Sequence, residues 1–256
     1  MATCIHLLQH YLPYDVDTEA DQKVKGTGLN RSTIKQHHSI MPPENLIKII
    51  QRQVRDFLST QSAGHGWDHI HRVRRTAMSI QADEGGDPCV VELAALLHDI
   101  GDAKFNDGRE RSGELAHGIL QKHQVDPNTI RHIVHIIENL SFRKRNQAEP
   151  LSHEGKIVQD ADRLDALGAI GIVRTIEYGE YKSQPFFDNE KPLAPSGALH
   201  FKEKLFKLKD LLNTASARRI ADQRVDFMRL FLQRYFDELQ ADTPDWVTDL
   251  LRPTSD

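Results

Sequence analysis

A histidine and an aspartate stand side by side, as His98 and Asp99, at the end of the most apolar stretch of the chain. Side chains that can carry charge are rarely placed there unless they are paired or bind a metal ion. A metal ion needs more ligands than these two. His69 and Asp162 each lie four positions from a valine on the same helical face, so both are expected to point inward. Three helices would then contribute four nitrogen and oxygen ligands.

Helices are predicted for the segments that must position these side chains. Apolar residues recur at three- and four-residue steps in residues 42–58, and again between Gly64 and Gly86. Asp87 and Pro88 then supply a helix start signal ahead of an almost continuously apolar run through Leu97. This third helix is predicted to run through the core and to carry the histidine–aspartate pair at its C-terminal end.

The rest of the chain shows helical periodicity and no convincing strand. Further helices are predicted at 112–123, 127–140, 154–179, 200–213 and 215–239. Gly168 and Gly171 are expected to allow close packing of the helix that carries Asp162. The fold class is therefore predicted to be all-α. A single domain over residues 42–241 is expected, between an N-terminal extension of residues 1–41 and a C-terminal tail of residues 242–256.

Aromatic residues are concentrated in the C-terminal half of the chain. Residues 182–199 contain three prolines and the Phe186–Phe187 pair, and they are predicted to form a long loop that closes over a substrate. Five phenylalanines recur at helical spacing and are expected in the core rather than in a base-stacking surface; they are Phe201, Phe206, Phe227, Phe231 and Phe236.

Composition argues against several classes of partner. Lys and Arg number 33 against 37 for Asp and Glu, a net charge of -4, so bulk binding to nucleic acid is not expected. All apolar runs are far shorter than the roughly 18 to 20 residues that cross a bilayer, so no membrane partner is expected. The two cysteines, Cys4 and Cys89, are too few for a disulfide framework. The chain is therefore predicted to be cytoplasmic.

The order of the motifs resembles the H…HD…D signature of the HD-domain metal-dependent phosphohydrolases. His69, His98–Asp99 and Asp162 match this signature, and further motifs are similar to one bacterial branch of nucleotide pyrophosphohydrolase-like proteins. These motifs are Ala63-Gly64-His65, Trp67, Arg72-Val73, Leu96 to Asp102, Ser141-Phe142, Gly155 to Gly171, Lys204 to Asn213 and Arg224 to Phe231. The resemblance spans roughly residues 45–240 and implies an HD-domain helical bundle with additional C-terminal helices.

The resemblance also implies a metal cofactor. His69, His98, Asp99 and Asp162 would bind a divalent ion, Mn²⁺ or Mg²⁺. Two imidazoles and two carboxylates without a thiolate also suit Ni²⁺, Fe²⁺ or Zn²⁺, and the ligand set alone does not rank these ions. Open coordination positions would hold water and a phosphate oxygen, and would promote attack of hydroxide on phosphorus.

Other residues of the implied site have two interpretations. Asp99 and Asp102 are the catalytic candidates. At the position of Asp102, some superfamily members carry an acidic residue that acts as general acid or base. The alternative is that Asp102 is a loop residue that only forms hydrogen bonds with its neighbours. Lys104 could bind a substrate phosphate or be an ordinary solvated lysine. His65, one helical turn from His69, is a candidate for substrate binding. Relatives commonly have His-Asp where this chain has His65-Gly66, so the aspartate often found there is missing.

Three residues near the ligands complete the implied site. His135 matches a histidine of the same branch and would contact the substrate phosphate or a second ion; a hydrogen-bonded structural histidine is the alternative. Asp160 and Asp165 flank Asp162 and are expected to orient ligands or to pair with Arg163.

Function is predicted from the resemblance. The leading hypothesis is a nucleoside triphosphate pyrophosphohydrolase, acting on a dNTP or NTP, that releases the monophosphate and pyrophosphate. Other branches with the same ligands dephosphorylate nucleoside monophosphates, strip triphosphate from dNTPs, or open cyclic nucleotides and alarmones. A non-catalytic nucleotide-binding module is the hypothesis from a different class, motivated by Gly66. The partner expected in each case is a small phosphorylated molecule, and a homo-oligomer is compatible with the sequence.

Overall fold

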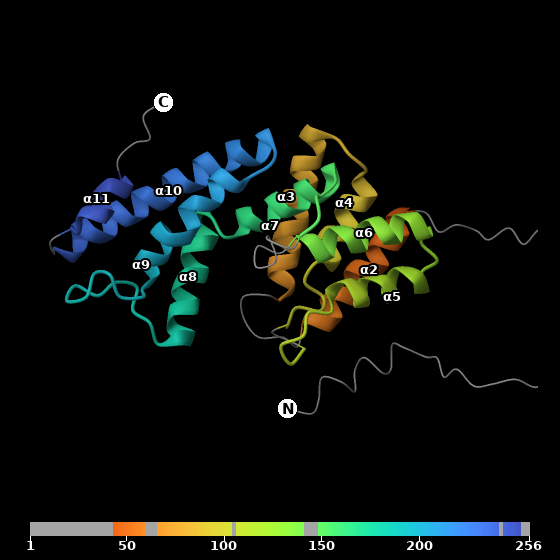
Figure 1. Ribbon diagram of the computed structural model, residues 1–256, viewed down its shortest axis with the longest axis horizontal. Helices are drawn as coiled ribbons and strands as arrows, with labels where there is room; N and C mark the ends of the chain where they lie inside the picture. Colours follow the sequence, from red (N-terminus) through yellow and green to blue (C-terminus); the bar gives the residue numbers. More distant parts are fainter. Residues whose placement is uncertain (1–42, 60–65, 104–105, 141–147, 241–242, 252–256) are drawn as a thin grey trace, which may run out of the picture. The chain divides into compact units, whose positions relative to one another are not determined.

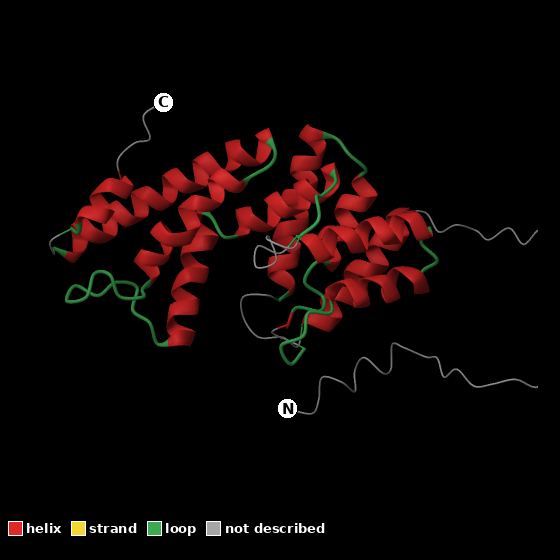
Figure 2. Ribbon diagram, viewed as in Figure 1, coloured by secondary structure: helices red, strands yellow, loops and turns green. Residues whose placement is uncertain are grey.

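The computed structural model of the protein describes residues 43–59, 66–103, 106–140, 148–240 and 243–251. Every regular element within these ranges is helical, which confirms the predicted all-α class (Figures 1 and 2). The first five are α2 Pro43–Leu58, α3 Trp67–Glu84, α4 Pro88–Leu97, α5 Ser112–Lys122 and α6 Pro127–Asn139, and they lie where the periodicity predicts them. None of the described helices is long and apolar enough to cross a membrane.

Helix α4 is buried on most sides, as its composition predicts. The Asp87 carboxylate caps its N-terminus by accepting hydrogen bonds from the backbone N–H groups of Cys89, at 2.8 Å, and Val90, at 3.3 Å. Pro88 occupies the first turn, where its missing N–H costs nothing. The helix packs against α2, α3, α6 and α7. Its C-terminal end, which carries the His98–Asp99 pair, is therefore held inside the bundle.

The helix predicted over residues 154–179 is in fact two helices, α7 His153–Asp165 and α8 Gly168–Lys182. Gly168 has a φ of +75°, a conformation that side chains with a Cβ rarely adopt, so the chain turns there. The prediction that Gly168 and Gly171 lie on the Asp162 helix is therefore wrong. Both belong to α8, and Gly171 lets the Ala166 carbonyl approach α8, because a Cβ on Gly171 would lie 2.2 Å from that oxygen.

Replacing Gly171 with alanine is expected to lower the free energy of unfolding by about 2–4 kcal/mol, since the added methyl group meets rigid backbone. Gly118 in α5 is the matched control, because a Cβ there meets nothing within 4 Å. Gly118→Ala is expected to stabilise the protein by about 0.5–1 kcal/mol through helix propensity. Urea unfolding of both variants checks this, and equal effects would contradict the crowding at Gly171.

The C-terminal helices differ from the sequence-based expectation in two places. The segment predicted as one helix over 200–213 is divided into α9 Gly197–His200, a π-helical turn η3 Phe201–Leu205 and a 3₁₀ turn η4 Phe206–Leu211. Helix α10, Ala215–Leu239, has the predicted bounds. Beyond it, where a polar tail is expected, α11 Asp245–Leu251 packs against α10 and buries Trp246 and Val247.

The Phe186–Phe187 pair of the 183–196 connection packs against these C-terminal helices. Phe186 makes edge-to-face contacts with Phe201, Phe231 and Tyr235, and Phe187 makes one with Phe236. The pair that motivated the prediction of a closing loop therefore serves as a packing anchor.

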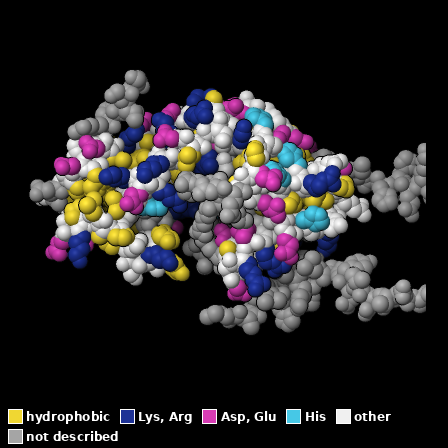
Figure 3. All heavy atoms as spheres, viewed as in Figure 1, with side chains coloured by type: hydrophobic (Ala, Val, Ile, Leu, Met, Phe, Trp, Pro, Cys, Tyr) yellow, Lys and Arg dark blue, Asp and Glu magenta, His cyan; other side chains and the backbone are white. Residues whose placement is uncertain are grey.

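Apolar side chains also reach the surface in this part of the chain. Phe227, expected in the core, is 48% exposed, and Ile170, Val173 and Tyr181 of α8 are exposed as well. Figure 3 shows hydrophobic side chains gathered over the region where Figure 1 labels α8 to α11.

Candidate metal centre

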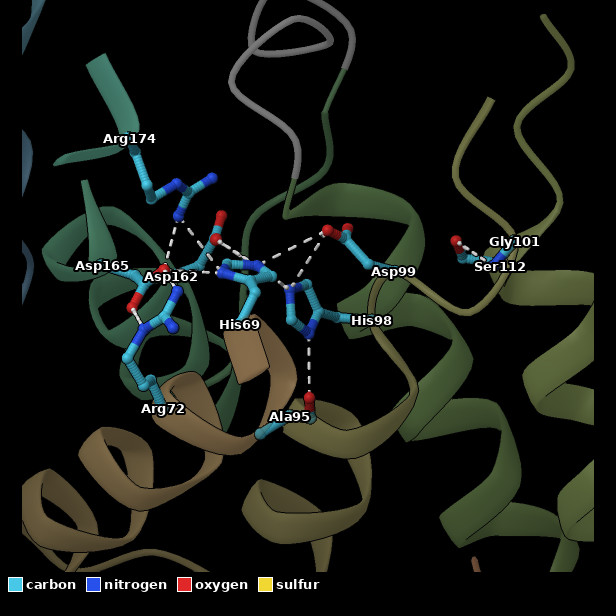
Figure 4. Close-up of polar contacts among 10 residues, drawn as sticks. All are labelled: His69, Arg72, Ala95, His98, Asp99, Gly101, Ser112, Asp162, Asp165 and Arg174. Carbon is cyan, nitrogen blue, oxygen red and sulfur yellow. Dashed lines mark hydrogen bonds and ion pairs between the residues drawn. The ribbon is translucent and has the colours of Figure 1, made fainter. Parts of the chain in front are cut away.

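Four side chains from three helical segments meet at one point (Figure 4). His69 comes from α3, Asp162 from α7, and His98 and Asp99 from the turn that follows α4. The Nε2 atoms of the two histidines are 3.3 Å apart. His69 Nε2 lies 3.6 Å from Asp99 Oδ2 and 3.5 Å from Asp162 Oδ1, and the corresponding distances from His98 Nε2 are 3.7 and 3.9 Å. The fold thus brings together the four residues predicted as ligands.

Each imidazole is held by its other ring nitrogen. His69 Nδ1 lies 2.7 Å from Asp165 Oδ2, and His98 Nδ1 lies 2.8 Å from the Ala95 carbonyl oxygen. A carboxylate and a carbonyl only accept hydrogen bonds, so both Nδ1 atoms donate. A neutral imidazole in this tautomer presents an unprotonated Nε2. In that neutral tautomer the two Nε2 lone pairs would face each other at 3.3 Å, an arrangement that a cation between them stabilises.

The distances fit a divalent ion. Nitrogen and oxygen ligands lie about 2.0–2.2 Å from such an ion, which places adjacent ligands of an octahedron about 3.0 Å apart and opposite ones about 4.3 Å apart. The five separations that involve a histidine Nε2, from 3.3 to 3.9 Å, fall between these limits. Among the described residues, His69, His98 and Asp99 offer ligand atoms that all lie within 4.8 Å of one another; Asp162 lies near both histidines but is not part of this mutually close group.

The centre is buried on its imidazole side and open on its carboxylate side. The side chains of His69 and His98 are 2% and 3% exposed, whereas those of Asp99 and Asp162 are 23% and 42% exposed. Among the four ligand candidates, the carboxylates are therefore the ones that a small molecule can contact.

Unbalanced negative charge raises the pKa of His69. Burial alone would lower that pKa, but the hydrogen bonds to Asp165 and Asp99 and the charge of Asp162 outweigh burial and raise it to about 9. In the absence of a metal ion, His69 therefore carries a proton at neutral pH. The contribution of this protonation to the free energy of unfolding of the metal-free protein is fully present below pH 6.5, and it is lost as the pH rises through about 9.

Metal binding at His69 Nε2 must displace this proton. We therefore expect the affinity for Mn²⁺ to rise about tenfold per pH unit between pH 6.5 and 8.5, with about one proton released per ion. Calorimetry in buffers of different ionisation enthalpy measures the proton release. An affinity that does not change over this range would show that the ion is not bound through His69.

Asp165 organises the outer side of His69. Its side chain is 4% exposed and accepts hydrogen bonds from His69 Nδ1, from Arg72 through Nε at 2.7 Å and Nη2 at 3.0 Å, and from Arg174 Nη1 at 2.5 Å. Burial would raise the pKa of this carboxyl group, but the bonds from His69 and Arg72 hold it well below its usual range. The expectation that Asp165 orients a ligand agrees with this contact to His69.

Asp160 has a different role from Asp165. It is fully buried and accepts hydrogen bonds from the backbone N–H and side-chain amide of Asn213 and from the backbone N–H and hydroxyl of Thr214, the N-cap of α10. Asp160 therefore attaches the start of α10 to α7. Arg163, the expected partner of Asp160 or Asp165, instead donates to the Leu211 carbonyl oxygen.

Of the four remaining site candidates, the structure describes two. His65 and Lys104 lie outside the described residues. Asp102 follows the ligands in the turn after α4, where its N–H donates to the Asp99 carbonyl at 3.2 Å. His135 lies on α6 with Nε2 3.1 Å from the Pro150 carbonyl oxygen and Nδ1 3.6 Å from a Glu149 carboxylate oxygen, which favours its structural interpretation.

Two arginines next to the centre were not identified as site residues. Arg72 lies one turn after His69 on α3, so its position on the same helical face was a usable signal. Arg174 lies on α8, beyond the turn at Gly168, and the sequence did not show that this turn directs α8 back toward His69.

Comparison with known proteins agrees with this geometry. Residues 66–167 match the HD domain model. The chain is 39% identical to the Bacillus subtilis protein YpgQ over 197 residues, which cover 76% of this chain and 92% of YpgQ. The structure of YpgQ in complex with ADP matches with a TM-score of 0.66 and 33% identity, over 77% of this chain and 97% of that chain. An HD-superfamily hydrolase from Bacillus thuringiensis matches with a TM-score of 0.68 and 38% identity, over 78% and 100% of the two chains.

All four side chains of the candidate centre lie within the residues that match the HD domain. The similarity to YpgQ extends over almost the whole of that protein. This chain therefore belongs to the HD-domain superfamily, together with proteins described as hydrolases.

Proposed function

We propose that the protein is a divalent-metal-dependent phosphohydrolase that acts on nucleotides. The observation that carries this proposal is the approach of the Nε2 atoms of His69 and His98 to 3.3 Å, flanked by two carboxylates. This donor set would hold Mn²⁺ or Mg²⁺, with Ni²⁺, Fe²⁺ and Zn²⁺ as alternatives. When bound, the ion supplies charge neutralisation for a phosphate group and lowers the pKa of a water molecule.

The protein's own groups would orient the ligands, leave room for the phosphate and accept a proton. Asp165 and the Ala95 carbonyl fix the rings of His69 and His98, so the ligands do not have to reorient when an ion binds. Asp99 and Asp162 leave the centre accessible on their exposed side, where a phosphate would enter. Asp102 is proposed to accept the proton of the attacking water, since it follows Asp99 in the same turn.

The nucleotide substrate is supported by similarity. YpgQ was crystallised in complex with ADP, and 97% of that chain is covered by the match. Together with the motifs of the pyrophosphohydrolase-like branch, this favours a dNTP or NTP as substrate, with the monophosphate and pyrophosphate as products. A monophosphate phosphatase and a cyclic nucleotide or alarmone phosphodiesterase are the alternatives within the superfamily.

Product analysis tests the proposal. The metal-free protein is resupplied with Mn²⁺ or Mg²⁺, incubated separately with each dNTP and NTP, and its products are identified by phosphorus NMR. Pyrophosphate that forms only after metal is added is the expected result. Orthophosphate or tripolyphosphate would instead identify one of the other chemistries. Nucleotide binding without any product would favour the non-catalytic module.

A further inference from the structure

Two guanidinium groups bind the Asp165 carboxylate beside the candidate metal centre, and a third lies near it. Arg72 comes from α3, Arg174 from α8 and Arg224 from α10. The first two donate hydrogen bonds to Asp165. Arg224 lies close enough for its charge to interact with both Asp165 and Arg72, and it donates to the Leu164 carbonyl oxygen at 2.5 Å. Three separate helices thus direct positive charge to one side of His69.

This positive charge is not balanced by the centre itself. A divalent ion with Asp99 and Asp162 would have no net charge, because the two histidines are then neutral. The three arginines and Asp165 together carry a net charge of +2, of which the exposed carboxylates near Arg72, Asp68 and Glu177, offset a part. Such an excess, partly shielded from solvent, attracts a polyanion.

Arg174 is the member of this group best placed to contact a substrate. The carboxylates of Asp68 and Glu177, both exposed, lie near Arg72 and partly neutralise it. Arg224 is held by the Leu164 carbonyl. Arg174 uses only its Nη1, toward Asp165 at 2.5 Å and 3.3 Å from His69 Nδ1. Its Nη2 and Nε form no hydrogen bond with the described residues, and its side chain is 22% exposed.

The position of Arg174 relative to the centre suggests what it binds. Figure 4 shows its side chain extending from α8 to the Asp165 side of the His69 ring, whereas the ion would lie at the opposite nitrogen, Nε2. The His69 ring would therefore separate this guanidinium from the ion and from the phosphate that the ion binds. The free N–H groups of Arg174 form a planar fork that matches phosphate oxygens.

We propose that Arg174 binds the phosphate that adjoins the one held at the metal centre, and so selects substrates with at least two linked phosphates. The inference rests on the proposed phosphohydrolase function and deepens it. Helix α8 begins after the residues 66–167 that match the HD domain, so this selectivity would be added to the common domain by the C-terminal helices.

Binding of pyrophosphate and of orthophosphate to the Mn²⁺-loaded protein tests this role without turnover. Arg174→Gln is expected to weaken pyrophosphate binding by about tenfold to a hundredfold, because charge-assisted hydrogen bonds are lost, and orthophosphate binding by less than about threefold. Arg174→Lys keeps the charge beside Asp165 but not the fork, so an intermediate loss is expected. Arg219→Gln, which removes an exposed arginine paired with Asp83, is the control and is expected to change neither.

The affinity for Mn²⁺ separates this role from a purely structural one. If Arg174 only holds Asp165 and His69 in place, Arg174→Gln weakens Mn²⁺ binding, the loaded protein loses affinity for pyrophosphate and orthophosphate by the same factor, and the proposal is overturned. Pyrophosphate binding that is unchanged in both variants would also overturn it. Should Arg174→Gln fail to fold, the lysine variant decides by the same two measurements. A wild-type protein that binds pyrophosphate but hydrolyses no nucleotide would refute the proposed function and leave the role of Arg174 intact.

Discussion

Replacing His98 with alanine is expected to reduce metal-dependent turnover at least about a thousandfold, since several kcal/mol of charge stabilisation by the ion would be lost. His98 contributes one of the two Nε2 atoms that lie 3.3 Å apart, and the bond from its Nδ1 to the Ala95 carbonyl fixes the orientation of its ring. Steady-state kinetics with pyrophosphate release as the readout measures the loss.

His123→Ala is the matched control for that variant. His123 is a partly buried histidine that contacts Gln53 at 3.2 Å and lies at the end of α5. Its replacement is expected to change turnover by less than about threefold, because an ordinary side-chain hydrogen bond contributes only about 1 kcal/mol. Circular dichroism verifies that both variants are helical. A His98→Ala protein that is folded and fully active would refute the proposed centre.

Replacing Asp165 with asparagine is expected to weaken Mn²⁺ binding about tenfold to a hundredfold and to lower the free energy of unfolding by about 3 kcal/mol. The variant removes the negative charge that His69, Arg72 and Arg174 share. The two guanidiniums then lose the buried carboxylate they share, and only the exposed Asp68 and Glu177 remain near Arg72. The His69 ring also loses the carboxylate that binds its Nδ1. Calorimetric titration and urea unfolding measure the two effects.

Asp160→Asn separates those two effects. Asp160 lies on the same helix and is also a buried carboxylate, but it accepts its hydrogen bonds from Asn213 and Thr214 rather than from a ligand. Its replacement is expected to lower the free energy of unfolding by about 2–3 kcal/mol and to change Mn²⁺ affinity by less than about threefold. Equal losses of affinity in both variants would show that the contact between Asp165 and His69 has no special role.

Features encoded within one helix could be predicted from the sequence. The Asp87–Pro88 signal predicts the start of α4, and the Asp87 side chain caps that helix; α6 begins in the same way, with Asp126 capping it before Pro127. The grouping of His69, His98, Asp99 and Asp162 followed from helical faces and from the resemblance to a known family.

Features that depend on turns and on contacts between distant parts of the chain could not be predicted from the sequence. The backbone turns at Gly168, which has a positive φ, but the spacing of apolar residues continues across it. The sequence therefore predicts a single helix where the structure has α7 and α8. Arg174 reaches His69 only because of that turn. Helix α11 is short, and its burial depends on contact with α10 rather than on its own periodicity. Phe227 keeps the helical spacing of its neighbours and still faces outward.

The clamp between Asp160 and the start of α10 also bears on how the chain folds. The segment that matches the HD domain ends at residue 167, yet a buried carboxylate within it obtains its hydrogen-bond donors from Asn213 and Thr214. A chain truncated after residue 167 would lose these donors and would expose the surfaces of α3 and α7 that α10 covers. We therefore expect residues 66–167 alone to be less stable than the same residues in the whole chain. Amide hydrogens of α7 and of the first turn of α10 are expected to exchange together, as parts of one cooperative unit.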